Sequence, residues 1–183
     1  LDSNNENIRV LRDSLTVFNN KIIFNGRCED LVYALCSYDP ATKIVVKVGD
    51  SPSDIYPQYF IEYNNKLYFS KARQNSSDTE VSYYDGSTIT DITEINASGG
   101  ANPKYFTIWN DKLYFQADDD QTGKEIWSID TSDSASLFLD INSSASDSSP
   151  AFLMPFENKL HFAVNSVKDL KSYSETAVLA DVG

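Results

Sequence analysis

The chain lacks several features on which common classes of protein function depend. It has 183 residues with one histidine, two cysteines and one methionine, and 15 basic residues face 27 acidic ones for a net charge of −12. We expect no nucleic-acid partner, because phosphate binding needs clustered Lys or Arg. No apolar run approaches the roughly 18 residues of a membrane-spanning helix, so we expect no membrane insertion. Leu1 follows neither an initiator Met nor a charged-then-apolar leader, which indicates a processed or truncated start.

The chain contains one short sequence motif four times. It occupies residues 20–24, 65–69, 111–115 and 158–162, and its lysines are Lys21, Lys66, Lys112 and Lys159. The Lys-to-Lys steps are therefore 45, 46 and 47 residues. A period of this size is typical of propeller blades, which are stabilised by stacking on their neighbours.

Each copy of the motif is the second strand of a predicted hairpin. An aromatic residue stands three positions before every Lys, and two residues rich in Asn and Asp lie between them; the aromatic residues are Phe18, Tyr63, Trp109 and Phe156. Asn and Asp tolerate the positive φ of a two-residue hairpin turn. Pro57, Pro103 and Pro150 stand nine residues before three of the lysines and separate the units, since proline suits the mouth of a strand.

Two further strands complete each unit. The third ends at Asp39, Asp85 or Asp130 in the first three units, and turn residues lead into a fourth strand. The fourth unit is about six residues shorter than the others, and its last two strands are expected at 170–174 and 177–182. The strands carry bulky residues on both faces, as expected of sheets sandwiched between neighbours. The sequence therefore predicts an all-β, β-propeller-like fold of four units with four antiparallel strands each, about 46 residues per unit, at 14–56, 57–102, 103–149 and 150–183.

The third unit resembles the ELWxxDGT repeat family. It reads Glu125-Ile-Trp127-Ser-Ile-Asp130-Thr131, and the second unit keeps Glu80, Asp85 and Gly86 but has Ser82 in place of the Trp. The first unit has Cys36 at the Trp position and Ala34 at the Glu position. The resemblance covers residues 14–183. It implies propeller-like blades in large extracellular or cell-surface proteins, and it supplies no catalytic residues.

Few residues are candidates for catalysis, metal binding or ligand binding. His161 stands two after Lys159, where the other units have Ile23, Tyr68 and Tyr114, so we expect a packed strand residue. Asp118, Asp119 and Asp120 are weak candidates for a Ca²⁺ site, with a solvated turn as the preferred interpretation; no other cofactor is expected. Trp109 and Trp127 could stack on sugars, but their place in the repeat favours core packing.

Three Asn-x-Ser/Thr sites, at Asn75, Asn96 and Asn142, favour a secreted or cell-surface glycoprotein. Cys28 and Cys36 show no metal-ligand pattern, and adjacent antiparallel strands could bring them within disulfide reach, so we expect a disulfide rather than two buried thiols.

The N-terminal segment 1–13 contains one apolar stretch, formed by Ile8, Arg9, Val10 and Leu11. Propellers often close by lending a terminal strand to the last blade, because an unpaired edge invites aggregation. This stretch is the candidate closing strand, and the alternative is donation to another copy, which would give a head-to-tail filament.

These features together predict a non-enzymatic extracellular structural or adhesive module, which associates with itself or with other extracellular proteins, with a subunit of a surface or matrix filament as one form. The alternatives are a carbohydrate-binding, lectin-like propeller and, third, a glycoside hydrolase with two facing carboxylates. The sequence names neither ligand nor partner, and it leaves ring closure and glycan occupancy open.

Overall fold

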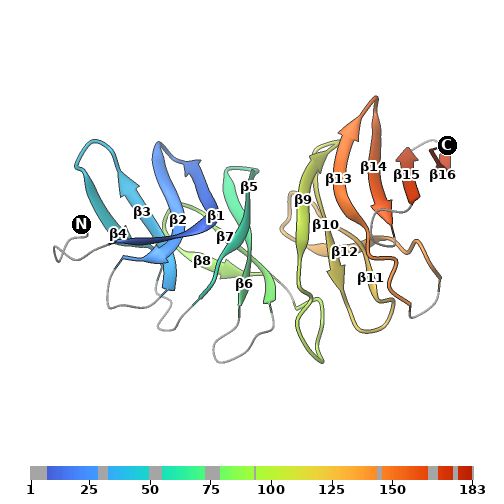
Figure 1. The fold of residues 1–183 in the computed structure, drawn as a ribbon, viewed down its shortest axis with the longest axis horizontal. Helices are drawn as coiled ribbons and strands as arrows, with labels where there is room; N and C mark the ends of the chain where they lie inside the picture. The colour runs from blue at the N-terminus through green and yellow to red at the C-terminus, as the bar shows by residue number, and fades with distance from the viewer. Residues whose placement is uncertain are drawn as a thin grey trace. The chain divides into compact units, whose positions relative to one another are not determined.

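The structure, a computed structural model, describes residues 8–28, 33–49, 55–72, 79–92, 94–143, 146–164, 169–174 and 177–182. These residues form sixteen strands in four antiparallel sheets, and the strands of each sheet follow chain order (Figure 1). None of them forms a helix long and apolar enough to cross a membrane. The all-β prediction of four four-stranded units is confirmed.

The strand bounds match the four repeats. Sheet 1 contains β1 (Arg9–Phe18), β2 (Lys21–Arg27), β3 (Tyr33–Asp39) and β4 (Ile44–Lys47). Sheet 2 contains β5 (Gln58–Tyr63), β6 (Lys66–Ala72), β7 (Thr79–Tyr84) and β8 (Ile89–Asp91). Sheet 3 contains β9 (Lys104–Trp109), β10 (Lys112–Asp118), β11 (Lys124–Ile129) and β12 (Ala135–Leu139). Sheet 4 contains β13 (Ala151–Phe156), β14 (Lys159–Val164), β15 (Asp169–Ser174) and β16 (Ala177–Asp181).

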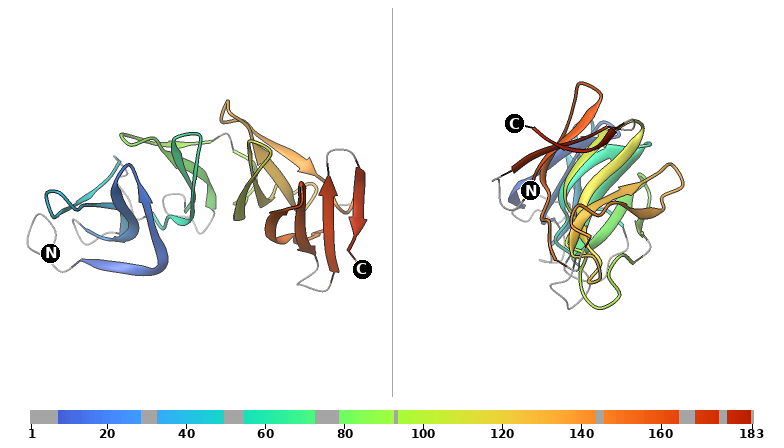
Figure 2. Two further views of the ribbon diagram at one scale, coloured as in Figure 1. Left: turned by 90° about the horizontal axis from the view of Figure 1, so that it is seen from above. Right: turned by 90° about the vertical axis from the view of Figure 1, so that its right-hand side faces the viewer.

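The four repeats are grouped into two compact parts of the chain, and from here on 'unit' means one of these two parts. The first unit is Leu1–Asp91 with sheets 1 and 2, and the second is Ile92–Gly183 with sheets 3 and 4. Inside each unit the first strands of the two sheets contact each other, β1 with β5 and β9 with β13. Figure 2 shows the two sheets of each unit as neighbouring layers, blue to green in the first and yellow to red in the second. Two-layer packing gives each unit its own core.

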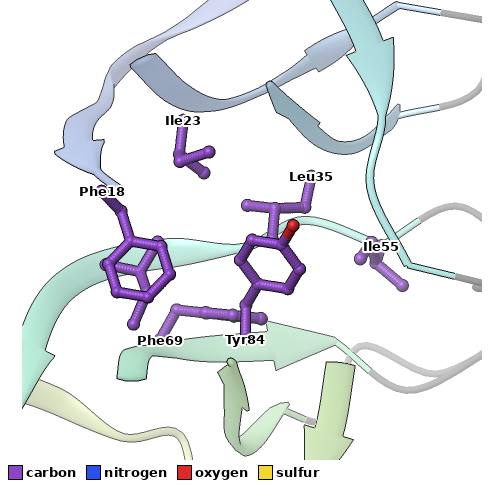
Figure 3. Packing of buried hydrophobic residues seen from close by; sticks show 7 residues of the cluster. Phe18, Ile23, Leu35, Ile55, Phe69 and Tyr84 are labelled. Carbon is purple, nitrogen blue, oxygen red and sulfur yellow. The ribbon is translucent and has the colours of Figure 1, made fainter. Parts of the chain in front are cut away.

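The core of the first unit lies between the facing sides of sheets 1 and 2 (Figure 3). Its buried residues come from both sheets and from the segment that joins them: Phe18, Ile23, Leu35, Ile55, Leu67, Phe69 and Tyr84. The ring centroids of Phe18 and Tyr84 lie 5.9 Å apart across this layer. Each such side chain contributes roughly 1.5–3 kcal/mol on full burial.

The second unit repeats this arrangement between sheets 3 and 4. Its buried residues are Trp109, Tyr114, Ile126, Leu153, Leu160, Phe162 and Val164. Phe138 and Tyr173, at the edge of this cluster, meet at a centroid distance of 4.9 Å. Trp109 is 5% exposed, so its predicted role in core packing is confirmed.

The four hairpin turns have the geometry that their residues predict. In the first three, both central residues have positive φ, for example 49° at Asn64 and 58° at Asn65. The fourth turn has φ values of 47° at Glu157 and 59° at Asn158. Two successive positive φ angles are the mark of a type I′ turn, which matches the twist of the flanking strands.

The predicted disulfide is confirmed. Cys28 and Cys36 are bonded, with their Cα atoms 6.1 Å apart. Cys28 directly follows β2 and Cys36 lies in β3, the strand paired with β2. Both side chains are buried with Phe24 and Val45 in a small cluster on sheet 1.

The apolar stretch Ile8, Arg9, Val10 and Leu11 does not close the last sheet. Arg9 pairs with Arg27 and Val10 with Gly26, so the stretch extends β1 within sheet 1. A register shift between Val10 and Leu15 lets β1 continue along β2, and Ile8 packs against the cluster around the disulfide. Sheet 4 is built from β13 to β16 alone among the described strands. Donation of this stretch to another copy stays a prediction.

The fourth turn yields the first test. Glu157 occupies a left-handed position that is Asn in the other three turns, and Asn adopts that conformation at lower cost than Glu. We expect Glu157→Asn to raise the free energy of unfolding by about 0.5–1 kcal/mol, measured by urea denaturation. The reciprocal change Asn64→Glu should lower it by a similar amount. Equal stability of both variants and the parent chain would show that turn conformation does not limit stability here.

Candidate functional site

Three of the four first strands contain an aromatic residue with a left-handed backbone. The residues are Tyr59, Tyr105 and Phe152, with φ values of 59°, 57° and 55°, and each stands two positions after a proline. The strand pairing is irregular at all three places, between Gln58 and Ile61 in β5, along β9, and between Ala151 and Met154 in β13. Positive φ is an outlier for bulky side chains and costs about 1–3 kcal/mol. Such strain collects at functional sites.

In the second unit two of these aromatic residues lie next to each other. The rings of Tyr105 and Phe152 lie 5.2 Å apart at an interplanar angle of 53°. Phe152 is 62% exposed, and its counterpart in the first unit, Tyr59, is 42% exposed. We call Tyr105 and Phe152 the aromatic pair. Phe152 is open to solvent, whereas Tyr105 is partly buried and packs against the core of the second unit.

Hydrogen bonds to sheet 3 hold the segments that lead into the aromatic pair. The Gln116 side-chain amide, buried on β10, donates to the carbonyl oxygen of Pro150 over 2.7 Å. The amide of Asp118 donates to the carbonyl oxygen of Ala101 over 2.9 Å, which fixes the segment before Tyr105. The entries to β9 and β13 are therefore both tied to β10.

A buried carboxylate ties another loop to the same sheet. Glu125 is 0% exposed, and its carboxylate accepts hydrogen bonds from the amides of Ile141 at 2.9 Å and Ser148 at 3.1 Å. Burial raises the pKa of Glu125, and the hydrogen bonds from Ser148 and Ile141 offset this only in part. Sequence reasoning assigned no role to Glu125. The available signal was Glu80 at the same place in the second repeat, which is also buried.

The acidic run forms a turn. The carboxylate of Asp118 accepts from the Asp120 amide, and that of Asp119 accepts from the Gln121 and Thr122 amides at 2.9 and 2.7 Å. Burial of Asp119 acts to raise its pKa, but these hydrogen bonds lower it overall. Among the described residues no three His, Cys, Asp or Glu side chains are grouped to hold a metal ion. The hydrogen bonds agree with the preferred interpretation of the run as a turn, and the three weak Ca²⁺ candidates do not form such a group.

His161 lies in β14 and is partly buried. Its ring is 6.0 Å from that of Phe156, and its Nε2 atom has no hydrogen-bond partner among the described residues. No carboxylate or hydroxyl orients it there, so the pattern of a general base with its partner is not formed.

The glycosylation sites differ in accessibility. Asn75 lies outside the described residues. Asn96 is 4% exposed, and its side-chain oxygen accepts hydrogen bonds from the amides of Ser98 and Gly99, which argues against a glycan on the folded chain. Asn142 is exposed. Glycosylation stays a prediction, while the disulfide is compatible with an extracellular location.

The fold places the chain among β-propeller-like proteins. The similar solved structures include virginiamycin B lyase from Staphylococcus aureus in selenomethionine-substituted form, with a TM-score of 0.60 and 16% identity over 92% of this chain. They also include the catalytically inactive histidine-to-alanine variant of that lyase with quinupristin, with a TM-score of 0.62 and 17% identity over 92% of this chain. The chain spans about half of their length, 54% in both cases.

Sequence comparison finds less. No protein-family model matches the chain, and neither does any curated protein. The resemblance to ELWxxDGT repeats therefore stays a prediction.

The comparisons correct the expectation that the chain is not an enzyme. Both solved structures named above are of a lyase and not of a structural or adhesive module, so inferring a non-catalytic role from regular repeats was wrong. The physical reason is that repeat positions determine stacking, whereas catalysis depends on strand ends and loops. At 16–17% identity the likeness shows the fold alone and transfers no reaction.

Glu125 gives a test with a defined sign. Because folding raises its pKa, the folded chain holds this proton more tightly, and the associated stability is lost as pH rises through the raised value. We expect the stability of the parent chain relative to Glu125→Gln to fall as pH rises from 4 to 8 in urea denaturation. Glu62→Gln, at an exposed carboxyl, is the control and should show no such trend.

Glu125→Ala separates charge from hydrogen bonding. It leaves the Ile141 and Ser148 amides without their acceptor, at a cost of about 1–3 kcal/mol for each buried donor. Wild-type stability in this variant would show that the loop is not held by Glu125.

Proposed function

We propose that the chain is a ligand-binding part of a β-propeller and that the aromatic pair binds a neutral carbohydrate, in a secreted or cell-surface setting. The observation that carries the proposal is the recurrence of an aromatic residue at a strained backbone position in three repeats. Packing does not account for that cost at Phe152, because its ring is mostly exposed. Strain of this kind is retained where it presents a side chain to a ligand.

The chemistry of the surface favours an uncharged ligand with apolar faces. The exposed ring of Phe152 can stack on the C–H face of a sugar, and the adjacent, partly buried Tyr105 carries a hydroxyl that can exchange hydrogen bonds with sugar hydroxyls. The net charge of −12 disfavours anionic ligands. Binding sites commonly combine an apolar lining with a few polar groups in this way.

A ligand-binding role is compatible with catalysis by the same protein. The related fold hosts a lyase, and a substrate held on the aromatic pair would need catalytic groups from neighbouring loops or from other parts of a longer chain. Because the chain spans about half of the related proteins, the activity of the whole protein is part of the proposal.

The proposal is tested by direct binding. The purified chain should be retained on a glycan array, and its affinity for the best glycan should be measured by calorimetry. Phe152→Ala should weaken binding at least tenfold, because it removes the exposed stacking face. Tyr56→Ala is the matched control, since Tyr56 is 40% exposed but has ordinary backbone geometry outside the first strands. The proposal fails if no glycan is retained or if Phe152→Ala binds as well as the parent chain.

Quinupristin is the second ligand to test, because a solved protein of this fold was crystallised with it. Binding that depends on Phe152 would replace the carbohydrate with this ligand at the same surface. Conversion to a product, followed by mass spectrometry, would define the chain as an enzyme.

A further inference from the structure

The register of the repeat determines which face of the first sheet in each unit meets the second sheet of that unit. Two positions face forward, the aromatic residue three before the repeat Lys and the residue two after it. In sheet 1 these are Phe18 and Ile23, each 1% exposed and packed on sheet 2. In sheet 3 they are Trp109 and Tyr114, 5% and 2% exposed and packed on sheet 4.

The first of these positions is open in sheet 4, and the second is open only in part. Phe156 is 58% exposed, whereas His161 is partly buried and its Nε2 atom is buried without a hydrogen-bond partner among the described residues. Met154, which pairs with His161 across the strands, is 58% exposed, and Leu170 on β15 is 48% exposed. We call Met154, Phe156, His161 and Leu170 the forward face. It lies on β13, β14 and β15, orange to red in Figure 1.

Two other positions face backward, toward the preceding sheet. They stand six before and one after the repeat Lys. In sheet 4 they are Leu153 and Leu160, 7% and 0% exposed and packed on sheet 3. In sheet 2 they are Phe60 and Leu67, both in the core shared with sheet 1.

In sheet 1 the backward positions are open. Leu15 is 61% exposed and Ile22 is 37% exposed. They share one side of the hairpin with Val17, which pairs with Ile22 and is 66% exposed. We call Leu15, Val17 and Ile22 the backward face.

We propose that the forward face of sheet 4 binds the backward face of sheet 1 in a second copy of this chain. Each unit shows the contact in question, because its two sheets pack a forward side on a backward side. The forward face therefore matches a sheet of the same repeat, and the backward face of sheet 1 is open to supply it. The apolar side chains at both faces are those that such packing buries.

A second copy is the occupant because it offers a backward face of the same repeat, formed by Leu15, Val17 and Ile22. The contact is head to tail, since different faces meet, and it either closes into a ring or extends as a filament. The inference is independent of the aromatic pair and of its ligand.

The test is the association state of the 183-residue chain, measured by sedimentation velocity across a concentration series. The parent chain should form dimers or larger assemblies. The forward variant, Met154→Ser with Phe156→Ser, and the backward variant, Leu15→Ser with Ile22→Ser, should each be monomeric. An equimolar mixture of the two variants should form a heterodimer, because one retains an intact backward face and the other an intact forward face.

The matched control is Phe152→Ser, which removes an equally exposed aromatic side chain from β13 without touching the forward face. It should associate like the parent chain. All substituted positions are well exposed or at the open face, and circular dichroism checks that each variant is folded. Hydrogen exchange of the parent chain provides a readout without substitution, since β1, β2, β13 and β14 should gain protection with concentration.

Several outcomes would overturn the proposal. A parent chain that is monomeric at all concentrations would show that a second copy covers neither the forward face nor the backward face. Persistent association of the backward variant together with loss in the forward variant would mean that two forward faces meet. Association of both single-face variants by themselves, or exchange protection elsewhere, would place the contact on another surface.

Discussion

The burial of one sheet's forward side against the next sheet's backward side is the interaction on which the structure depends. Each sheet is apolar on both sides, so a single sheet in water would leave one or both exposed. Phe18 and Trp109 illustrate the requirement, since each closes a core that neither sheet could form alone. Turns, prolines and the disulfide maintain the register that brings these side chains together. The same requirement bears on the apolar side chains that stay open on sheets 1 and 4, such as Leu15 and Phe156.

Sequence reasoning succeeded where a local rule and the packing agree. The Asn-rich pairs predicted type I′ turns, and the observed φ values agree because Asn accepts a left-handed backbone. The Cys28–Cys36 bond could be anticipated because both residues lie on or next to paired strands. Sequence reasoning did not predict that β1 begins at Arg9. The register shift between Val10 and Leu15, which lets β1 continue along β2, has no recognisable sequence signal.

The aromatic pair was missed for a different reason. Propensity argues against a positive φ at Tyr or Phe, so residue-by-residue reasoning assigns Tyr105 and Phe152 to ordinary strand. The signal lay in the alignment of repeats, where an aromatic residue follows a proline by two positions three times. The expectation of a non-enzymatic role failed similarly. It was derived from residues that the repeats share, whereas ligand binding and catalysis depend on positions where strand geometry departs from the regular pattern.

The two proposals meet in one strand. β13 carries Phe152 of the aromatic pair as its second residue and Phe156 of the forward face as its last, while Leu153 between them is fixed in the core with sheet 3. A strand buried on one side and open on the other keeps more freedom than one enclosed by two sheets. If a second copy covers the forward face, β13 loses part of that freedom before any ligand binds. The ligand then meets a ring that is already ordered, and the entropy lost on binding is smaller. Association and ligand affinity would consequently be coupled through β13.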